Sequence, residues 1–315
     1  MTIGISMIVR DAEHTIERAL QSCTFASQIV VVDTGSKDAT PHKVLRYGAE
    51  LHFLTWRDDF SFARNYALGF MRTNWIVQLD ADEYIENPEQ WTKSIAAIHD
   101  THTIAGGRIQ LGNVLESGES RHHHSYTRLF RNNRDFYYEG SIHEQIAPSI
   151  EKAGFVIETL PLSIIHVGYQ ENNQQKYERN TRIIDAELAE NPDDPFLLYH
   201  AGNTAFALHN YTKAHEYYVK VHQSTQLSEE QQDIIRMRLA QIAIAQSDYA
   251  AAKQYMQNPS AYSEIEGLRQ YLLGSVFAIE GHYADAIASL HNSRISSMVN
   301  RKNVAEFIQQ LRTLI

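Results

Sequence analysis

The sequence has very little cysteine and no long apolar segment. Its 315 residues include one cysteine, Cys23, so no disulfide bond can form within the chain. No apolar run approaches the roughly 18 residues that a membrane-spanning helix needs, and no basic start followed by an apolar stretch precedes the first expected strand. From these absences we expect a protein that has no transmembrane segment and resides in the cytoplasm.

Excess positive charge is also lacking. The chain has 28 Lys and Arg residues against 38 Asp and Glu residues, and the resulting formal net charge of −10 argues against a nucleic-acid partner. It has neither the G-x-G-x-x-G pattern of a dinucleotide site nor the G-K-[ST] of a phosphate-binding P-loop. Its length and its 43% of hydrophobic residues suffice for two domains.

The first part of the chain alternates short apolar runs with amphipathic segments. Four β-favouring runs predict buried strands, at residues 3–9, 28–32, 50–54 and 75–79. The segments between them predict helices, and we expect Asp11 to cap the first of these. Because strands and helices alternate, the strands should be parallel and joined by right-handed crossovers. This order predicts an α/β domain.

Two aspartates, Asp80 and Asp82, come directly after the run 75–79. Ligands of open α/β sheets bind at the edge where the parallel strands end. Two carboxylates one residue apart at that edge can approach one hard cation, which in turn can hold a diphosphate. Taken alone, the pair is more simply explained as a polar turn, so this interpretation depends on the neighbouring segments.

Two further polar features fall near the same edge. The turn after the second run has groups suited to bind the base and ribose of a nucleoside, in Asp33, Thr34, Gly35 and Ser36. Arg64 is expected near the start of a helix, where the helix dipole disfavours a cation. An anionic partner would explain Arg64 better, and a salt bridge to Asp58 or Asp59 is the alternative.

Together these motifs resemble one enzyme family. The segments that carry the resemblance are 5–11, 31–36, Trp56 with 59–65, and 80–83. They look like the GT-A glycosyltransferases of the large inverting family that uses nucleotide sugars. The similarity spans about residues 3 to 170 and points to the subgroup with C-terminal tetratricopeptide repeats, which includes bacterial peptide S-glycosyltransferases and lipopolysaccharide-core transferases. It implies a GT-A (Rossmann-like) domain at 1–172, a UDP-sugar donor, and Mn²⁺ or Mg²⁺ as cofactor.

The resemblance also implies roles for particular residues. Those expected to contact the nucleotide sugar are Val9, Asp33, Thr34, Arg64 and Asp80. Many relatives carry two consecutive aspartates where this chain has Asp33 and Thr34, so either residue could contact the uracil. The metal would be held by Asp82, with Asp80 nearby and His166 as a further ligand, and would neutralise charge on the leaving diphosphate.

A catalytic base must accept the proton of the attacking acceptor. Similar enzymes place this base after the paired aspartates, which indicates Glu144. His143 is the alternative base, although on a strand it would point to the opposite face. Three consecutive histidines, His122, His123 and His124, cannot all face one metal from a strand, so we predict that they lie in a solvated loop.

From residue 177 onward helical periodicity replaces the strand pattern, with a helix stop and start at 191–195. Three similar segments begin with the pairs Asn210-Tyr211, Asp248-Tyr249 and His282-Tyr283. Their tyrosines are 249 − 211 = 38 and 283 − 249 = 34 residues apart, near the tetratricopeptide period of about 34. Residues 173–315 are thus expected to form a repeat domain that binds the acceptor or mediates self-association; a plain helical bundle is the alternative.

The leading hypothesis is a metal-dependent inverting glycosyltransferase with a peptide, protein or polysaccharide acceptor. Its rival is a binding protein in which the repeats are the working part and the GT-A domain is degenerate. The presence of Asp80, Asp82, Arg64 and Glu144 argues against such a loss of activity. A sugar nucleotidyltransferase is a third hypothesis, but these enzymes usually have a Gly-rich loop after the first strand, and residues 7–12 contain no glycine.

Overall fold

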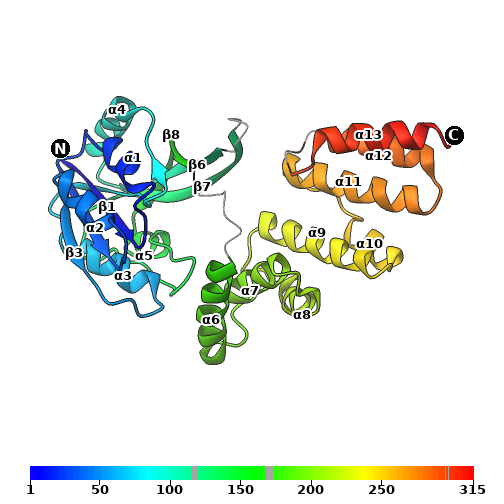
Figure 1. Cartoon of the computed structure of the whole chain (residues 1–315), viewed down its shortest axis with the longest axis horizontal. Helices are drawn as coiled ribbons and strands as arrows, with labels where there is room; N and C mark the ends of the chain where they lie inside the picture. The colour runs from blue at the N-terminus through cyan, green and yellow to red at the C-terminus, as the bar shows by residue number, and fades with distance from the viewer. Residues whose placement is uncertain (115–119, 168–173, 295, 297) are drawn as a thin grey trace. The chain divides into compact units, whose positions relative to one another are not determined.

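The computed structural model describes residues 1–114, 120–167, 174–294, 296 and 298–315 (Figure 1). The chain divides into two compact units, Met1–Asn173 and Gln174–Ile315. The domain boundary that we predicted, between residues 172 and 173, lies outside the described residues. Within the described ranges, no helix combines the length and apolar character that crossing a membrane requires.

Unit 1 is built on one mixed sheet. Its strands are β1 (Ile3–Val9), β2 (Gln28–Asp33), β3 (Glu50–Phe53), β4 (Trp75–Gln78), β5 (Glu83–Tyr84), β6 (Ile104–Val114), β7 (Ser120–Arg131) and β8 (Val156–His166). Their order in the sheet is β3-β2-β1-β4-β7-β6-β8-β5. Strands β3, β2, β1 and β4 are parallel, as predicted, whereas β7 pairs antiparallel with β4. The parallel half brings the ends of β1, β2 and β4 to one edge of the sheet.

Helices cover both faces of this sheet (Figure 1). They are α1 (Ile16–Gln21), α2 (Thr40–Arg46), α3 (Phe60–Leu68), α4 (Pro88–His99) and α5 (Ala147–Lys152). Consecutive residues of β2 belong to two separate hydrophobic clusters, one on each face of the sheet. Val31 belongs to the cluster that includes residues of α1, α2 and α4, and Val30 to the cluster that includes Ile150 of α5. A strand buried on both faces is apolar throughout, which is why the runs were readable from the sequence.

Two local predictions for unit 1 are wrong. Asp11 does not cap α1: it lies five residues before that helix with φ of 48°, and Thr15 occupies the cap position. The Asp11 carboxylate instead accepts a hydrogen bond from the Lys37 backbone N–H at 2.7 Å. The segment with His122 to His124 belongs to β7 and is not a loop. A long strand pair of β6 and β7 overrides the polar character of that segment.

Unit 2 is helical throughout its described residues. Its helices are α6 (Gln174–Glu190), α7 (Pro195–Ala207), α8 (Tyr211–Val221), α9 (Glu229–Ala245), α10 (Tyr249–Tyr255), α11 (Ser263–Ile279), α12 (Tyr283–Ser293) and α13 (Arg301–Arg312). The predicted stop and start at 191–195 is confirmed, because α6 ends at Glu190 and Asp194 caps α7 by accepting from the Leu197 N–H at 2.9 Å.

The same kind of turn joins the two helices in each of the pairs α7–α8, α9–α10 and α11–α12. Each turn has a residue with positive φ, in the order His209, Ser247 and Gly281, and the second helix of each pair then starts at the tyrosine that sets the repeat spacing. The fourth residue of each second helix is a fully buried alanine, in the order Ala214, Ala252 and Ala286. Unit 2 is therefore an array of tetratricopeptide-like helix pairs.

Candidate active site

The loops that follow β1 and β2 are bound to each other by side chains. The Asp11 N–H donates to Ser36 Oγ at 2.9 Å, and the Lys37 N–H donates to Asp11 Oδ1 at 2.7 Å. The Glu13 N–H donates to Asp38 Oδ2 at 2.9 Å. Carboxylates and hydroxyls thus satisfy backbone donors across the two loops. These bonds fix both loops at the edge where the parallel strands end.

Asp33, the last residue of β2, is 1% exposed. Its Oδ1 accepts from the N–H groups of Gly35 at 2.8 Å and Ser36 at 2.7 Å, while its buried Oδ2 accepts no hydrogen bond from the described residues. The Thr34 hydroxyl and N–H both donate to the Val9 carbonyl, at 3.0 and 2.9 Å. Of the two residues predicted to contact the uracil, Asp33 therefore keeps a buried oxygen without a hydrogen bond, which costs free energy.

Arg64 is 6% exposed and lies in the middle of α3, not near the start of a helix as we expected, and its anionic partners belong to the chain. Both are carboxylates of the chain: Nη2 donates to Asp80 Oδ1 at 2.9 Å and Nε donates to Glu144 Oε1. Asp59, the alternative partner, instead caps α3 by accepting from a backbone N–H. Asp58 accepts from the indole N–H of Trp56 at 2.7 Å. Arg64 therefore joins the end of β4 to the loop that contains Glu144.

Helix α3 also holds that loop through backbone contacts. The Asn65 amide pairs with the backbone of Tyr138, donating to its carbonyl at 2.9 Å and accepting from its N–H at 2.8 Å. The Phe60 N–H donates to the Ser141 carbonyl at 2.8 Å, and the Ser61 hydroxyl donates to the Gly140 carbonyl at 2.5 Å. Residues 80 positions apart in sequence, such as Arg64 and Glu144, are in this way fixed next to each other.

Two charged residues that the sequence interpretation missed complete this cluster. Arg128 of β7 donates from Nη1 and Nη2 to Asp80 Oδ2 at 3.3 Å, and from Nη2 to Glu83 Oε1 at 3.1 Å. The Asp80 N–H donates to Glu83 Oε2 at 2.9 Å. The Gln78 side chain lies among these charged groups. The amide orientation that satisfies its hydrogen bonds directs its oxygen toward Arg64 and Arg128, and its nitrogen then donates to Tyr138 Oη at 3.0 Å. Arg64 of α3 and Arg128 of β7 thereby both hold the turn from Asp80 to Glu83.

The environment moves the pKa values of Asp80 and Glu83 in opposite directions. Burial alone would raise the pKa of Asp80, but the guanidinium groups of Arg64 and Arg128 outweigh burial and hold that pKa well below its usual range. For Glu83 burial dominates and, with the charges of Asp80 and Asp82, raises the pKa to about 7 despite Arg128. Asp80 is therefore a permanent anion at neutral pH, and both of its oxygens are bound to arginines.

Asp82 lies in a different environment, although only one residue separates it from Asp80. Its side chain is 38% exposed, and its Oδ2 lies 3.0 Å from His166 Nε2. The contact arises because β5 and β8 pair antiparallel with Glu83 opposite His166, and because the Val167 N–H donates to the Asp82 carbonyl at 2.9 Å. The structure thus brings together Asp82 and His166, two of the three residues predicted to hold a metal.

Glu144 and His143 lie in a loop, not on the strand that we considered. The loop is closed by a bridge between Glu139 and Gln145. His143 is exposed and has φ of 54°, whereas the Glu144 side chain is 11% exposed. Glu144 Oε1 accepts from Arg64, and its Oε2 accepts no hydrogen bond from any described residue. One oxygen of Glu144 is therefore oriented by an ion pair while the other has capacity to accept a proton.

The described residues contain no group of three or more His, Cys, Asp or Glu side chains arranged to hold a metal ion. Asp82 and His166 supply a carboxylate oxygen and an imidazole nitrogen, a donor set that suits Mn²⁺ and, for the oxygen, Mg²⁺. Two protein ligands leave most coordination positions to phosphate oxygens and water, which is usual for cations that bind with a nucleotide. The residues present fit a cation that arrives together with a diphosphate.

Comparison with known proteins agrees with the motifs. Residues 5–150 match the family model described as Glycosyl transferase family 2. A TPR repeat-containing protein of Synechococcus elongatus is 32% identical over 209 residues, which cover 62% of this chain and 50% of that protein. The SPbeta prophage-derived glycosyltransferase SunS of Bacillus subtilis is 26% identical over 226 residues, which cover 70% of this chain and 53% of that protein. The chain spans about half the length of these curated relatives.

Among solved structures, S. aureus TarS 1-349 in complex with UDP-GlcNAc aligns with 81% of this chain and 90% of that chain. The sequence identity of this alignment is 16% and the TM-score is 0.46.

Proposed function

We propose that residues 5–150, which match the family model described as Glycosyl transferase family 2, form a glycosyltransferase domain, and that the protein transfers a sugar from a nucleotide-diphosphate donor to an acceptor. We expect a UDP-sugar as donor, inversion at the anomeric carbon, and a peptide, protein or polysaccharide as acceptor. The observation that carries the proposal is the pair of aspartates after β4, of which Asp80 is bound by Arg64 and Arg128 while Asp82 is half exposed beside His166.

The nucleoside would bind over the loops after β1 and β2. Asp33 Oδ2 is the acceptor that lacks a partner there, and an N–H of the base could satisfy it. The Thr34 hydroxyl donates to Val9, which leaves Asp33 as the better candidate for a uracil N–H. Because Asp33 Oδ2 is enclosed, binding of the base would require a small opening of the surrounding side chains.

Asp82 and His166 would hold Mn²⁺ or Mg²⁺ together with the diphosphate. When bound, the cation would neutralise the negative charge that develops on the leaving diphosphate. Asp80 serves differently in this proposal: its two oxygens accept from Arg64 and Arg128, so it fixes the turn that presents Asp82. In this proposal Asp80 has a positioning role, and Asp82 and His166 are the metal ligands.

Glu144 is the proposed base. Its ion pair with Arg64 orients the carboxylate, and the second oxygen, Oε2, would accept the proton of the attacking acceptor group. Exposed His143 on the same loop stays the alternative base. In either case the base lies on the loop that α3 holds against the end of β4.

A thermal-shift panel of nucleotide sugars, each with Mn²⁺, with Mg²⁺ and with chelator, tests the proposed function. A ligand that binds the native state raises the melting temperature by mass action, so we expect a shift for one nucleotide class and only with metal. Hydrolysis of the responsive donor should then be detectable without acceptor. If no nucleotide sugar shifts the transition, the rival hypothesis of a binding protein with a degenerate domain is favoured.

A further inference from the structure

Gln78 is a polar residue at the end of an apolar strand, and the proposed roles do not use it. Strand β4 is buried along its whole length, and Gln78, its last residue, is 6% exposed. A buried amide costs free energy unless its oxygen and its nitrogen are both hydrogen-bonded. The partners of Gln78 therefore indicate what this amide does.

Two arginines determine which way the Gln78 amide faces. A guanidinium group has only donors, so the group that faces Arg64 and Arg128 has to be an acceptor. With its oxygen toward them, Gln78 accepts from Arg64 Nη2 at 2.9 Å and Nη1 at 3.0 Å, and also from Arg128. The same two arginines share the carboxylate of Asp80. Because like charges repel, the amide oxygen is a second shared acceptor that helps to keep the two cations together.

Tyr138 holds the other end of the same amide. The Gln78 nitrogen donates to Tyr138 Oη at 3.0 Å, and Tyr138 is 4% exposed. Burial raises the pKa of Tyr138 well above its usual range, so its hydroxyl stays neutral. The backbone of Tyr138 is in turn fixed by the Asn65 amide of α3, at 2.9 and 2.8 Å. Gln78 is thus held between the two arginines and a tyrosine whose own position is fixed.

We propose that Gln78 and Tyr138 are positioning residues, which act on the reaction by fixing Arg64 against Glu144. Arg64 Nε donates to Glu144 Oε1, while its Nη atoms donate to Gln78 and Asp80. A planar guanidinium that is bound along two sides cannot turn without losing several hydrogen bonds, so the Glu144 carboxylate is held in one orientation. The effect on the rate rests on the proposed function, whereas the fixing of Arg64 does not.

Donor hydrolysis by the full chain tests the effect on the rate, with UDP-glucose and UDP-N-acetylglucosamine as probes. In this reaction Glu144 Oε2 would take a proton from water, while the water oxygen bonds to the anomeric carbon and the bond to the departing UDP oxygen breaks. Gln78→Met removes the shared acceptor at similar side-chain length, and we expect the single-turnover rate to fall about ten- to a hundredfold. Tyr138→Phe removes only a hydroxyl and should cost less than about tenfold.

A double-mutant cycle separates positioning from a general loss of structure. In a Glu144→Gln background there is no base left to orient, so Gln78→Met and Tyr138→Phe should each lower the remaining rate by less than about twofold. A residue with a merely structural role would lower the rate by the same factor in both backgrounds.

Exchange of the Arg64 Nε–H with water, measured by ¹⁵N NMR, tests the fixing of Arg64 without any turnover. In wild type this proton should exchange slowly, because Nε donates to Glu144 and the Arg64 side chain is 7% exposed. Gln78→Met should speed the exchange at least about tenfold, and Tyr138→Phe should speed it less.

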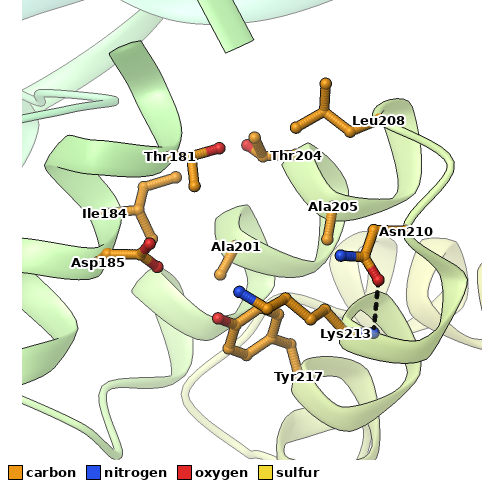
Figure 2. Close-up of a pocket in the computed structure, with 10 residues that line it drawn as sticks. All are labelled: Thr181, Ile184, Asp185, Ala201, Thr204, Ala205, Leu208, Asn210, Lys213 and Tyr217. Atoms are coloured by element: carbon orange, nitrogen blue, oxygen red, sulfur yellow. Dashed lines mark hydrogen bonds between the residues drawn. The ribbon is translucent and has the colours of Figure 1, made fainter. Parts of the chain in front are cut away.

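The chain offers a matched control in Gln28, another buried amide. Gln28 is the first residue of β2, is 8% exposed, and donates to Glu50 Oε1 at 3.1 Å and to the Phe70 carbonyl at 2.9 Å. Gln28→Met should lower stability without changing the Arg64 exchange or the hydrolysis rate. Lys213→Met is a second control; Lys213 lines a cavity of about 200 Å³ between α6, α7 and α8, in the other unit (Figure 2).

Unchanged Arg64 exchange in Gln78→Met, equal rate losses in the two backgrounds, or an equal rate loss in Gln28→Met would each overturn the inference. Tyr138→Phe decides the matter by the same criteria if Gln78→Met does not fold. Failure of wild type to hydrolyse either donor would count against the proposed function alone, because the exchange measurement still decides whether Gln78 fixes Arg64. Hydrolysis with unchanged exchange would reject the inference alone.

Discussion

The end of β4 in unit 1 and the helix pairs of unit 2 are built on opposite principles. At β4, charged side chains from distant segments lie together: Arg64 and Glu83 are buried, and Asp80 and Arg128 are partly buried. In the helix pairs, buried contacts are made by small and aromatic residues close in sequence, such as Gly202 against Tyr218. Buried charge is costly and adds little stability over apolar packing. We therefore interpret the charge cluster of unit 1 as a site, whereas the helix pairs of unit 2 rely mainly on apolar packing and bury charge at Arg269.

The largest expected effect comes from breaking the buried charge cluster. Arg128→Leu would leave Glu83, which is 2% exposed, without its cation. We expect the free energy of unfolding to fall by about 3–5 kcal/mol, as when one partner of a buried ion pair is removed. Denaturant titration measures it. Arg108→Leu on the neighbouring strand, whose side chain is 44% exposed, is the control and should cost less than about 1 kcal/mol; equal losses would contradict the account.

Removing the proposed base should affect turnover and spare the fold. Glu144→Gln keeps the shape of the side chain but cannot accept a proton, so the transfer rate should fall by about two or more orders of magnitude with donor affinity retained. Single-turnover kinetics and donor titration separate the two quantities. Glu158→Gln, exposed on β8, is the control. Normal turnover of Glu144→Gln together with loss in His143→Ala would move the base by one residue.

A smaller effect is expected from overpacking a helix pair. A Cβ at Gly202 would lie 2.5 Å from Tyr218 Cε1, and Tyr218 is fully buried with its hydroxyl donating to Asn203 at 2.8 Å. Gly202→Ala should therefore destabilise unit 2 by about 1–3 kcal/mol without changing nucleotide binding in unit 1. Thr212→Ala, exposed on α8, is the control. A loss of nucleotide affinity in Gly202→Ala would show that the two units are not functionally separate.

The smallest effect concerns acid stability in unit 2. Burial would raise the pKa of Glu266, but hydrogen bonds from Arg269, Gln270 and the Ser260 N–H outweigh burial and lower it to about 2. A carboxyl with a lowered folded pKa stabilises the fold above its unfolded pKa of about 4.5, and this stabilisation is lost as the pH falls toward 2. Glu266→Gln should therefore melt lower than wild type at pH 7, with the difference shrinking between pH 5 and about 2. A difference independent of pH would contradict this.

The sequence predicted those elements whose pattern is local. Strands β1, β2 and β4 are buried on both faces and read as apolar runs, and the repeat turns follow from tyrosine and alanine at fixed spacing. The loop predicted for His122 to His124 was wrong because pairing of β7 with β6 outweighs the polarity of that segment. The helix cap predicted at Asp11 was wrong because its carboxylate accepts from a backbone N–H 26 residues away.

The charge cluster was only partly predictable, for the same reason. An anionic partner was predicted for Arg64 from an expected place near a helix start, but Arg64 lies in the middle of α3 and its partner Glu144 is 80 residues away. Arg128 and Glu83 are 45 residues apart and belong to strands that are not neighbours in the sheet. The one available signal was the pair of arginines, Arg128 and Arg131, that flanks Leu129 and Phe130 at the end of β7. Its partners depend on the antiparallel half of the sheet, which no local pattern specified.

Calorimetric titration of UDP into the full chain, with and without Mn²⁺, tests most directly whether the end of β4 is a donor site. The proposed ligand role of Asp82 predicts that Mn²⁺ raises UDP affinity at least about tenfold in wild type, equivalent to about 1.4 kcal/mol, and leaves it unchanged in Asp82→Asn. Asp135→Asn, exposed after β7, should behave as wild type. Equal UDP affinity with and without Mn²⁺, or a Mn²⁺ effect that survives in Asp82→Asn, would contradict the account.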